Sequence, residues 1–234
     1  MMENYYNFLD ENIIEINDKI INACKEAQKN ISDITLIGIT KTVSSDVIFK
    51  AIEKGVVNIG ENKVQEMLSK YDDLKSIKHK THIVGHLQTN KVKYLPHKID
   101  MIQSVDSIKL ANTINKEYAK ENLLCEVLVE VNIGNENNKT GILYDDTEKL
   151  CLEILKLPNI RLKGLMCIPP ICENDMVRKY FEKMYALFID ISRKKLDNIY
   201  MDTLSMGMSQ DYDLAIKEGA TMVRIGTSLF GKRN

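Results

Sequence analysis

Short apolar runs rich in β-branched residues recur along most of this chain, and each is separated from the next by an amphipathic segment. Most of these runs do not alternate apolar with polar positions, which is typical of strands buried on both faces of a sheet. Eight strands are predicted, at residues 34–40, 56–59, 82–84, 101–105, 125–131, 162–168, 199–204 and 222–225. Every strand except the last is clearly followed by a segment with helical spacing.

The segments between the strands carry the start and stop signals of helices. In the first of them, Ser45 or Asp46 is a plausible N-cap, and Gly55 ends the helix. Further helices are expected from about residue 61, from 88, and over 107–120, 145–155, 174–194 and 210–218. A polar helix with its own apolar stripe, over about residues 3–29, precedes the first strand and is expected to pack outside the main body.

Strict alternation of strand and helix predicts parallel strands. Eight units in 234 residues favour a closed (β/α)8 barrel, a TIM barrel. The alternative is an open, doubly wound sheet, but no GxGxxG motif follows the first strand. No linker or change of composition divides the chain. We therefore expect a single domain over residues 1–234, with the extra N-terminal helix followed by the barrel over about 34–231.

The composition is that of a globular protein able to fill a core, with 44% apolar and 28% charged residues. A net charge of −1, with both signs mixed along the chain, argues against a nucleic-acid partner. We expect no membrane span, because no apolar run is long enough, and the N-terminus does not resemble a signal peptide. The five scattered cysteines predict reduced thiols in a cytoplasmic protein.

The first predicted strand ends in a lysine, Lys41, which is followed at once by a polar turn. A strongly hydrated ammonium gains little at the end of a buried strand, whereas an uncharged lysine amine is a nucleophile toward aldehydes. Lys41 is therefore a candidate for Schiff-base chemistry. The simpler explanation is a side chain that snorkels from the strand end into water, and the lysine taken alone favours it.

Functional groups of a barrel gather at the carboxyl ends of its strands, and phosphate often binds after strands seven and eight. Gly207 and Gly226 lie there and allow close approach of the backbone to an anion, although ordinary turns also use glycine. Arg224 stands inside an apolar strand, so it faces either an interior ligand or a buried carboxylate. The remaining polar or unusual residues at strand ends are Glu61, Asn62, His82, Gly85, Gln88, Asn132, Met166, Cys167, Ser205, Ser209 and Thr227.

A metal site is not expected. His79, His82 and His86 have spacings that suit one face of a helix, but His82 lies in a predicted strand, where these spacings do not converge. No cluster of cysteine and histidine has the spacing of zinc ligands. The histidines are therefore assigned to the structure rather than to metal binding.

Seven segments, in order from residue 37 to 231, match one known family. They are IGITK at 37–41, GENKVQE at 60–66, HIVGHLQTNK at 82–91, VN through KTG at 131–141, LKGLM at 162–166, LSMGMS at 204–209 and MVRIGTSLFG at 222–231. On these segments the chain resembles the pyridoxal phosphate homeostasis proteins, single-domain relatives of the barrel of alanine racemase. Each segment alone is weak evidence for the family, but the seven together are specific for it.

The resemblance implies that Lys41 carries pyridoxal 5'-phosphate (PLP) as an internal aldimine. Arg224 would face the pyridine nitrogen, and Asn62 would lie near the ring oxygen or the aldimine. Two positions depart from the family pattern: His86 replaces a residue that is usually small or proline, and Thr81 stands where an aromatic residue is common. Both are expected to flank the site and to alter its local shape.

The resemblance also implies a site for the phosphate group of the cofactor. Ser205, Gly226 and Thr227 would hold it, with help from backbone N–H groups near Met206. No residue is assigned a catalytic role, and the cofactor is the only ligand that the resemblance implies.

A cationic arginine opposite the ring nitrogen disfavours its protonation and weakens the ring as an electron sink. Alanine racemase adds a base from a second domain, and this chain is expected to lack one. The resemblance thus implies a monomeric protein without robust turnover. It would buffer PLP, deliver it to apo-forms of PLP-dependent enzymes, and sustain amino-acid and keto-acid balance. The alternatives are a PLP-dependent racemase or decarboxylase, and a phosphate-ligand barrel enzyme that uses Lys41 as a base.

Overall fold

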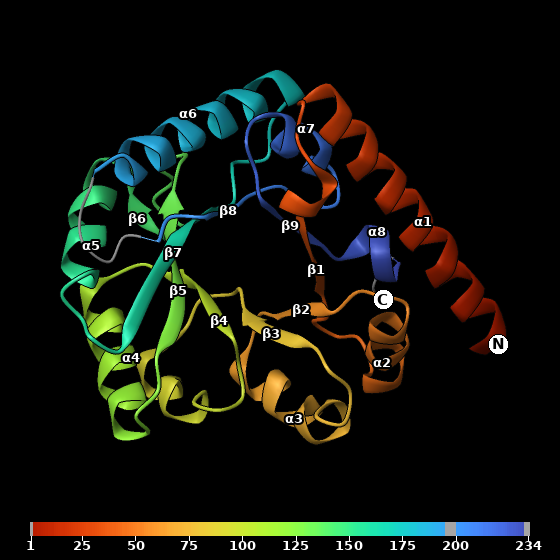
Figure 1. The fold of residues 1–234 in the computed structure, drawn as a ribbon, viewed down its shortest axis with the longest axis horizontal. Helices are drawn as coiled ribbons and strands as arrows, with labels where there is room; N and C mark the ends of the chain where they lie inside the picture. Colours follow the sequence, from red (N-terminus) through yellow and green to blue (C-terminus); the bar gives the residue numbers. More distant parts are fainter. Residues whose placement is uncertain (1, 195–199, 232–234) are drawn as a thin grey trace.

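Eight parallel strands close into a barrel in the computed structural model, which describes residues 2–194 and 200–231 (Figure 1). The barrel strands are β1 (Thr35–Ile39), β2 (Asn58–Glu61), β3 (Lys80–Ile83), β4 (Met101–Val105), β5 (Cys125–Asn132), β7 (Ile160–Cys167), β8 (Thr203–Ser205) and β9 (Met222–Ile225). The pairing of β4 with β5 and of β1 with β9 completes the circuit. The predicted barrel is therefore confirmed, and the open-sheet alternative is wrong.

Helices surround the barrel on its outside (Figure 1). They are α1 (Met2–Glu26), α2 (Ser45–Glu53), α3 (Val64–Leu74), α4 (Ile108–Lys120), α5 (Thr147–Ile154), α6 (Asn174–Ser192), α7 (Tyr212–Lys217) and α8 (Thr227–Phe230). The described residues also form three short 3-10 helices, η1 (Ile31–Asp33), η2 (Thr89–Tyr94) and η3 (Tyr144–Asp146). None of the described helices is both long and apolar enough to cross a membrane.

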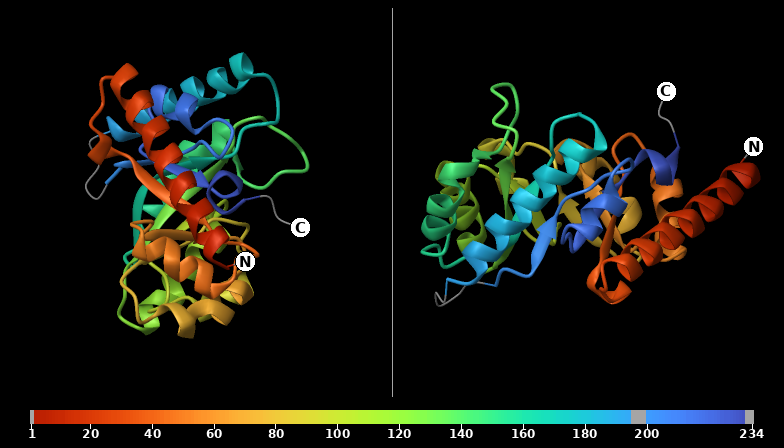
Figure 2. Two further views of the ribbon diagram at one scale, coloured as in Figure 1. Left: turned by 90° about the vertical axis from the view of Figure 1, so that its right-hand side faces the viewer. Right: turned by 90° about the horizontal axis from the view of Figure 1, so that it is seen from above.

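The N-terminal helix α1 packs against α7 and α8, outside the barrel, as its apolar stripe predicts (Figure 2). It ends three residues earlier than expected. Gln28 has a positive φ of 54°, a left-handed conformation that ends a right-handed helix. Beyond it, the Lys29 ammonium donates a hydrogen bond to the Ala220 carbonyl at 3.2 Å and ties the segment to the barrel.

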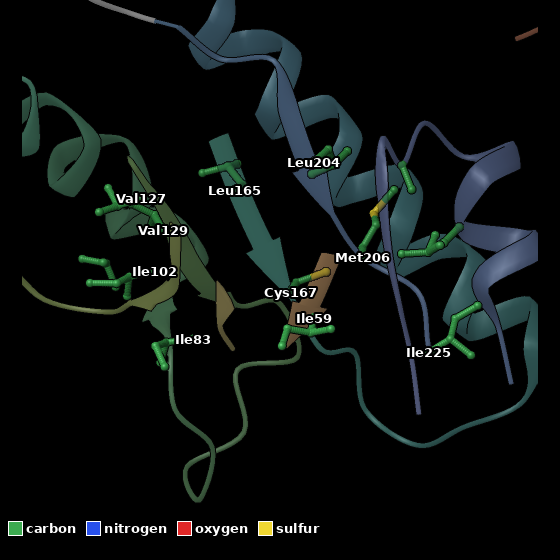
Figure 3. Packing of buried hydrophobic residues seen from close by; sticks show 14 of the residues in the cluster. Ile59, Ile83, Ile102, Val127, Val129, Leu165, Cys167, Leu204, Met206 and Ile225 are labelled. Carbon is green, nitrogen blue, oxygen red and sulfur yellow. The ribbon is translucent and has the colours of Figure 1, made fainter. Parts of the chain in front are cut away.

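Two layers of apolar side chains account for the buried, non-alternating strands. One layer points outward from the strands and lies under the helices, and Figure 3 shows part of it. The residues labelled there are Ile59, Ile83, Ile102, Val127, Val129, Leu165, Cys167, Leu204, Met206 and Ile225. A second, smaller cluster consists of Ile37, Ile39, Val84, Met101, Leu128, Met166 and Met222. Because each strand is covered on both faces, its sequence reads as continuous apolar residues.

Strand β2 begins two residues later than the predicted strand at 56–59. Val56 instead donates its N–H to the Ala51 carbonyl at 3.0 Å, a bond that closes the turn after α2. Pairing with β3 then continues through Glu61. The shift follows from local hydrogen bonds that apolar character alone does not reveal. A two-residue strand, β6 (Ile142–Leu143), pairs with the end of β5 and was not predicted.

Strand β8 is shorter than the predicted strand at 199–204, and residue 199 lies outside the described part of the chain. Its pairing with β7 begins where Thr203 meets Gly164. A Cβ atom at residue 164 would lie 1.7 Å from the Thr203 carbonyl oxygen, and Gly164 has a φ of +154°. Only glycine fits between the two strands at this point.

We expect Gly164→Ala to destabilise the protein strongly, by about 4 kcal/mol or more, because strand backbone must move. Gly55→Ala is the matched control: Gly55 also has a positive φ, of +98°, but nothing lies within 4 Å of its added Cβ. The control should cost only about 1–2 kcal/mol, the penalty of a left-handed alanine. Urea unfolding of both variants checks this, and equal losses would contradict the steric explanation.

Candidate functional site

A cavity of about 440 Å³ opens at the carboxyl ends of the barrel strands. Its walls come from the residues after β1, β7 and β8 and from β9 with the turn that follows it. The described residues that line it are Ile39, Lys41, Pro169, Pro170, Ile171, Cys172, Asn174, Val177, Met208, Ser209, Gln210, Asp211, Arg224, Gly226, Thr227 and Ser228. The cavity therefore lies at the end of the barrel where function was expected.

Lys41 reaches this cavity from the turn directly after β1. The residue is partly buried, and Ile39 beside it contributes an apolar side chain to the wall. No hydrogen bond or ion pair connects its ammonium with another residue in the described ranges. The amine is thus available to a ligand in the cavity rather than committed to a structural contact.

Arg224 enters the same cavity from β9, and its side chain is held in place from below. Its Nη1 donates to Ser205 Oγ at 2.7 Å, and its Nη2 donates to the Cys167 carbonyl at 2.8 Å. Ser205 in turn donates to Gln103 Oε1 at 2.8 Å, and the Gln103 amide lies 3.1 Å from His82 Nδ1. This buried polar chain fixes the guanidinium inside an apolar barrel.

The field around Arg224 combines burial with nearby acidic groups. Burial lowers the pKa of Arg224, while Glu130 and Asp211 act in the opposite direction. Burial also raises the pKa of both carboxyls. Neither carboxylate forms an ion pair with Arg224 among the described residues, so the interior-ligand alternative fits the arginine better than a buried carboxylate partner.

Two backbone amides converge on one oxygen at the cavity wall. The N–H groups of Gly226 and Ser228 each donate to Ser209 Oγ at 3.3 Å. Thr227 lies between the two amides and also lines the cavity. Neighbouring N–H groups that point at one oxygen are a suitable donor set for an anion.

Of the seven predicted site residues, Lys41, Arg224, Gly226 and Thr227 line the cavity. Ser205, Met206 and Asn62 do not, although all three are described. Ser205 is fully buried and its hydroxyl is engaged by its two partners, while the Met206 N–H donates to the Met222 carbonyl at 3.1 Å. Asn62 lies against Gly85, so that a Cβ there would meet its carbonyl oxygen at 2.5 Å. Direct cofactor contacts for these three residues stay predictions that this geometry does not favour.

Ser209 was a candidate from the sequence but not one of the seven predicted cofactor contacts, and it lines the cavity. It offers the hydroxyl that was expected from Ser205, and both residues belong to the SMGMS segment. The loop at 169–172 also lines one side of the cavity, and sequence reasoning did not select it. His86 and Thr81, expected to flank the site, are not among the described residues that line it.

Comparison with known proteins gives the class of the chain. Residues 18–234 match the family model described as the alanine racemase N-terminal domain. A pyridoxal phosphate homeostasis protein of Aquifex aeolicus is 43% identical over 224 residues, which cover 95% of this chain and 97% of the relative. The chain therefore belongs to the pyridoxal phosphate homeostasis protein family, whose barrel is that of the alanine racemase N-terminal domain.

Two solved structures agree with this assignment. A protein of Bifidobacterium adolescentis superposes with a TM-score of 0.91 at 30% identity, covering 97% of this chain and 96% of that one. PipY of Synechococcus elongatus PCC7942, solved with PLP bound, gives a TM-score of 0.78 at 28% identity, covering 85% and 93%. The barrel is thus shared with proteins of nearly the same length.

His82 supports a pH prediction. It is 3% exposed, and its Nε2 has no hydrogen-bond partner among the described residues. Burial, with a smaller contribution from Lys80, lowers the pKa of His82 from 6.5 to about 4. Between pH 6.5 and 4, His82 is therefore protonated in the unfolded chain but not in the native protein. The free energy of unfolding falls as the pH decreases through this range.

We expect this group to remove about 3 kcal/mol of unfolding free energy across that window. His82→Gln should flatten the corresponding part of the pH profile. His97→Gln, at an exposed histidine, is the control and should leave the profile unchanged. Chemical denaturation at a series of pH values measures the effect, and equal slopes for the wild type and His82→Gln would contradict it.

Proposed function

We propose that this chain binds PLP through a Schiff base to Lys41, and that it buffers and delivers the cofactor. The observation that carries the proposal is the single cavity lined by Lys41, Arg224, Gly226 and Thr227. The name of the Aquifex aeolicus relative and the PLP-bound structure of PipY support it. PLP supplies an aldehyde, a ring nitrogen and a phosphate group, and the cavity offers a partner for each.

The phosphate group fits the donor set at Gly226 and Ser228. Their N–H groups already share one acceptor oxygen, Ser209 Oγ, and a phosphate oxygen has the same hydrogen-bonding requirement with more charge. We assign the phosphate to these amides and to the hydroxyls of Ser209 and Thr227. Ser205 then acts indirectly, since its hydroxyl supports Arg224.

Arg224 is the proposed partner of the ring nitrogen. A guanidinium can donate a hydrogen bond there but does not readily give up a proton. An unprotonated ring nitrogen makes PLP a poor acceptor of electrons from the α-carbon of an amino acid. The bonds from Arg224 to Ser205 and Cys167 hold the guanidinium in place. The ring nitrogen would therefore keep this partner, and removal of the α-proton of an amino acid would stay slow.

The acid–base groups of the cavity also favour a carrier over a racemase. Racemisation needs groups that exchange a proton on both faces of the α-carbon. Besides Lys41 and Arg224, the titratable side chains among the described lining residues are Cys172 and Asp211. Asp211 Oδ1 already accepts the Met208 N–H at 2.6 Å. A racemase is therefore the weaker proposal, and no observation favours a phosphate-ligand enzyme without PLP.

The proposed function also implies partner proteins and a location in the cell. A protein that holds PLP without consuming it can pass it to apo-forms of PLP-dependent enzymes and so sustain amino-acid and keto-acid balance. We place this monomeric carrier in the cytoplasm, where reduced thiols persist. Four of its five free cysteines are buried and only Cys172 is exposed, which suits such thiols.

Lys41 should be the only lysine that forms a Schiff base. Borohydride reduction of the PLP-loaded protein converts the imine to a stable amine, and peptide mapping then locates it. We expect the label on the peptide that contains Lys41, because this is the lysine that lines the cavity. Lys41→Ala should abolish the visible absorbance of the imine.

Lys63→Ala is the matched control, since Lys63 is exposed and lies outside the described cavity lining. It should keep the absorbance and the labelled peptide of the wild type. A label on any lysine other than Lys41 in the wild type would show that the assignment is wrong.

A further inference from the structure

A buried lysine lies behind the turn that carries Lys41. It belongs to α3, a helix that packs against β2 (Figure 1). This residue, Lys70, is only 9% exposed. Its ammonium donates to the Thr40 carbonyl at 2.8 Å, to Glu61 Oε1 at 2.7 Å and to Glu66 Oε1 at 2.8 Å. An ammonium has three N–H donors, so all of them have an acceptor.

The acceptors hold the chain on both sides of Lys41. On the N-terminal side, the Thr40 hydroxyl donates to Glu61 Oε1 at 2.7 Å, in addition to the bond from Lys70 to its carbonyl. On the C-terminal side, the Thr42 N–H donates to Glu66 Oε1. Lys41 is thus the one residue between two anchored neighbours.

The turn needs such an anchor. Thr42 has a positive φ of 61°, a conformation that is uncommon for a β-branched residue and persists only where the surroundings impose it. The N–H of this strained residue is the group that Glu66 accepts. Releasing that bond would allow Thr42 to relax and would move the backbone that directs Lys41 into the cavity.

Opposite charges hold Lys70, Glu61 and Glu66 in one arrangement. Burial raises the pKa of Glu61, whereas for Glu66 burial is outweighed by the bonds from Lys70 and the Thr42 N–H, which lower its pKa. Glu61 and Lys70 also line a cavity of only about 10 Å³, room for one water at most. With so little water to replace the ammonium, removing Lys70 would leave two carboxylates without their shared partner.

We propose that Lys70, together with Glu61 and Glu66, is a positioning residue that fixes the turn bearing Lys41 and thereby sets how fast Lys41 captures an aldehyde cofactor. Capture joins Lys41 Nζ to the aldehyde carbon and releases the aldehyde oxygen as water, with no change of oxidation state. This inference rests on the proposed function of Lys41. It assigns Glu61 and Glu66 of the GENKVQE segment, together with Lys70, to the geometry of the amine rather than to cofactor contact.

Lys70→Met keeps most of the length of the side chain and removes all three donors. In the cofactor-free protein, the Thr42 amide should exchange with solvent about tenfold faster or more, as measured by NMR. The rate constant for PLP capture, followed by absorbance, should fall about tenfold to a hundredfold, because small misplacements of a reacting group are costly. Lys75→Met, which removes an exposed pair with Asp72 at the end of α3, should change neither quantity.

Glu66→Gln and Glu66→Ala separate positioning from stability and serve if Lys70→Met does not fold. Glutamine retains an oxygen for the Thr42 N–H, whereas alanine does not. The Thr42 amide of the glutamine variant should therefore exchange more slowly than that of the alanine variant, and its Lys41 should capture PLP faster. Both quantities should lie closer to the wild type in the glutamine variant. Thr42 exchange needs no cofactor, so it tests the cluster even if borohydride labels a lysine other than Lys41.

Two outcomes would overturn the inference. In the first, Lys70→Met lowers the melting temperature while Thr42 exchange and the capture rate stay within twofold of the wild type, so the cluster only stabilises the fold. In the second, Glu66→Gln and Glu66→Ala give the same exchange and capture rates, so the bond to Thr42 does not position the amine.

Discussion

Closure of the parallel barrel is the constraint on which the whole site depends. The pairing of β4 with β5 completes a circuit in which every strand runs the same way. The carboxyl ends of all strands therefore meet at one rim, and β1 lies directly beside β9. This neighbourhood brings Lys41, which follows β1, to the same cavity as Arg224 and Gly226, although the chain separates them by most of its length.

Two buried hydrogen-bond networks support the residues of that cavity. The chain from His82 through Gln103 and Ser205 holds Arg224 inside the barrel, and the bonds of Lys70 hold the turn at Lys41. In both, the cationic side chain is hydrogen-bonded, because an unpaired charge in an apolar interior is costly. A site built on such supports suits a protein that holds its cofactor in one geometry.

The sequence predicted the barrel well because buried parallel strands leave a strong pattern: residues 101–105 were placed correctly as a strand. It predicted Lys41 and Arg224 from their position at strand ends or inside apolar runs. It could not show that Ser209, rather than Ser205, faces the cavity, since both hydroxyls lie within one five-residue segment. Nor could it reveal that Lys70 binds the Thr40 carbonyl, because Thr40 is thirty positions away and meets it only in the folded barrel.

We propose that this family member holds PLP without robust turnover, and this proposal can be tested directly. The most direct test is deuterium exchange at the α-carbon of alanine and other amino acids, followed by NMR with the purified PLP-loaded protein. The account predicts exchange far slower than the ordinary enzymatic range of about 1–10³ per second. Exchange within that range, on any amino acid tested, would contradict it and show that the protein is a catalyst.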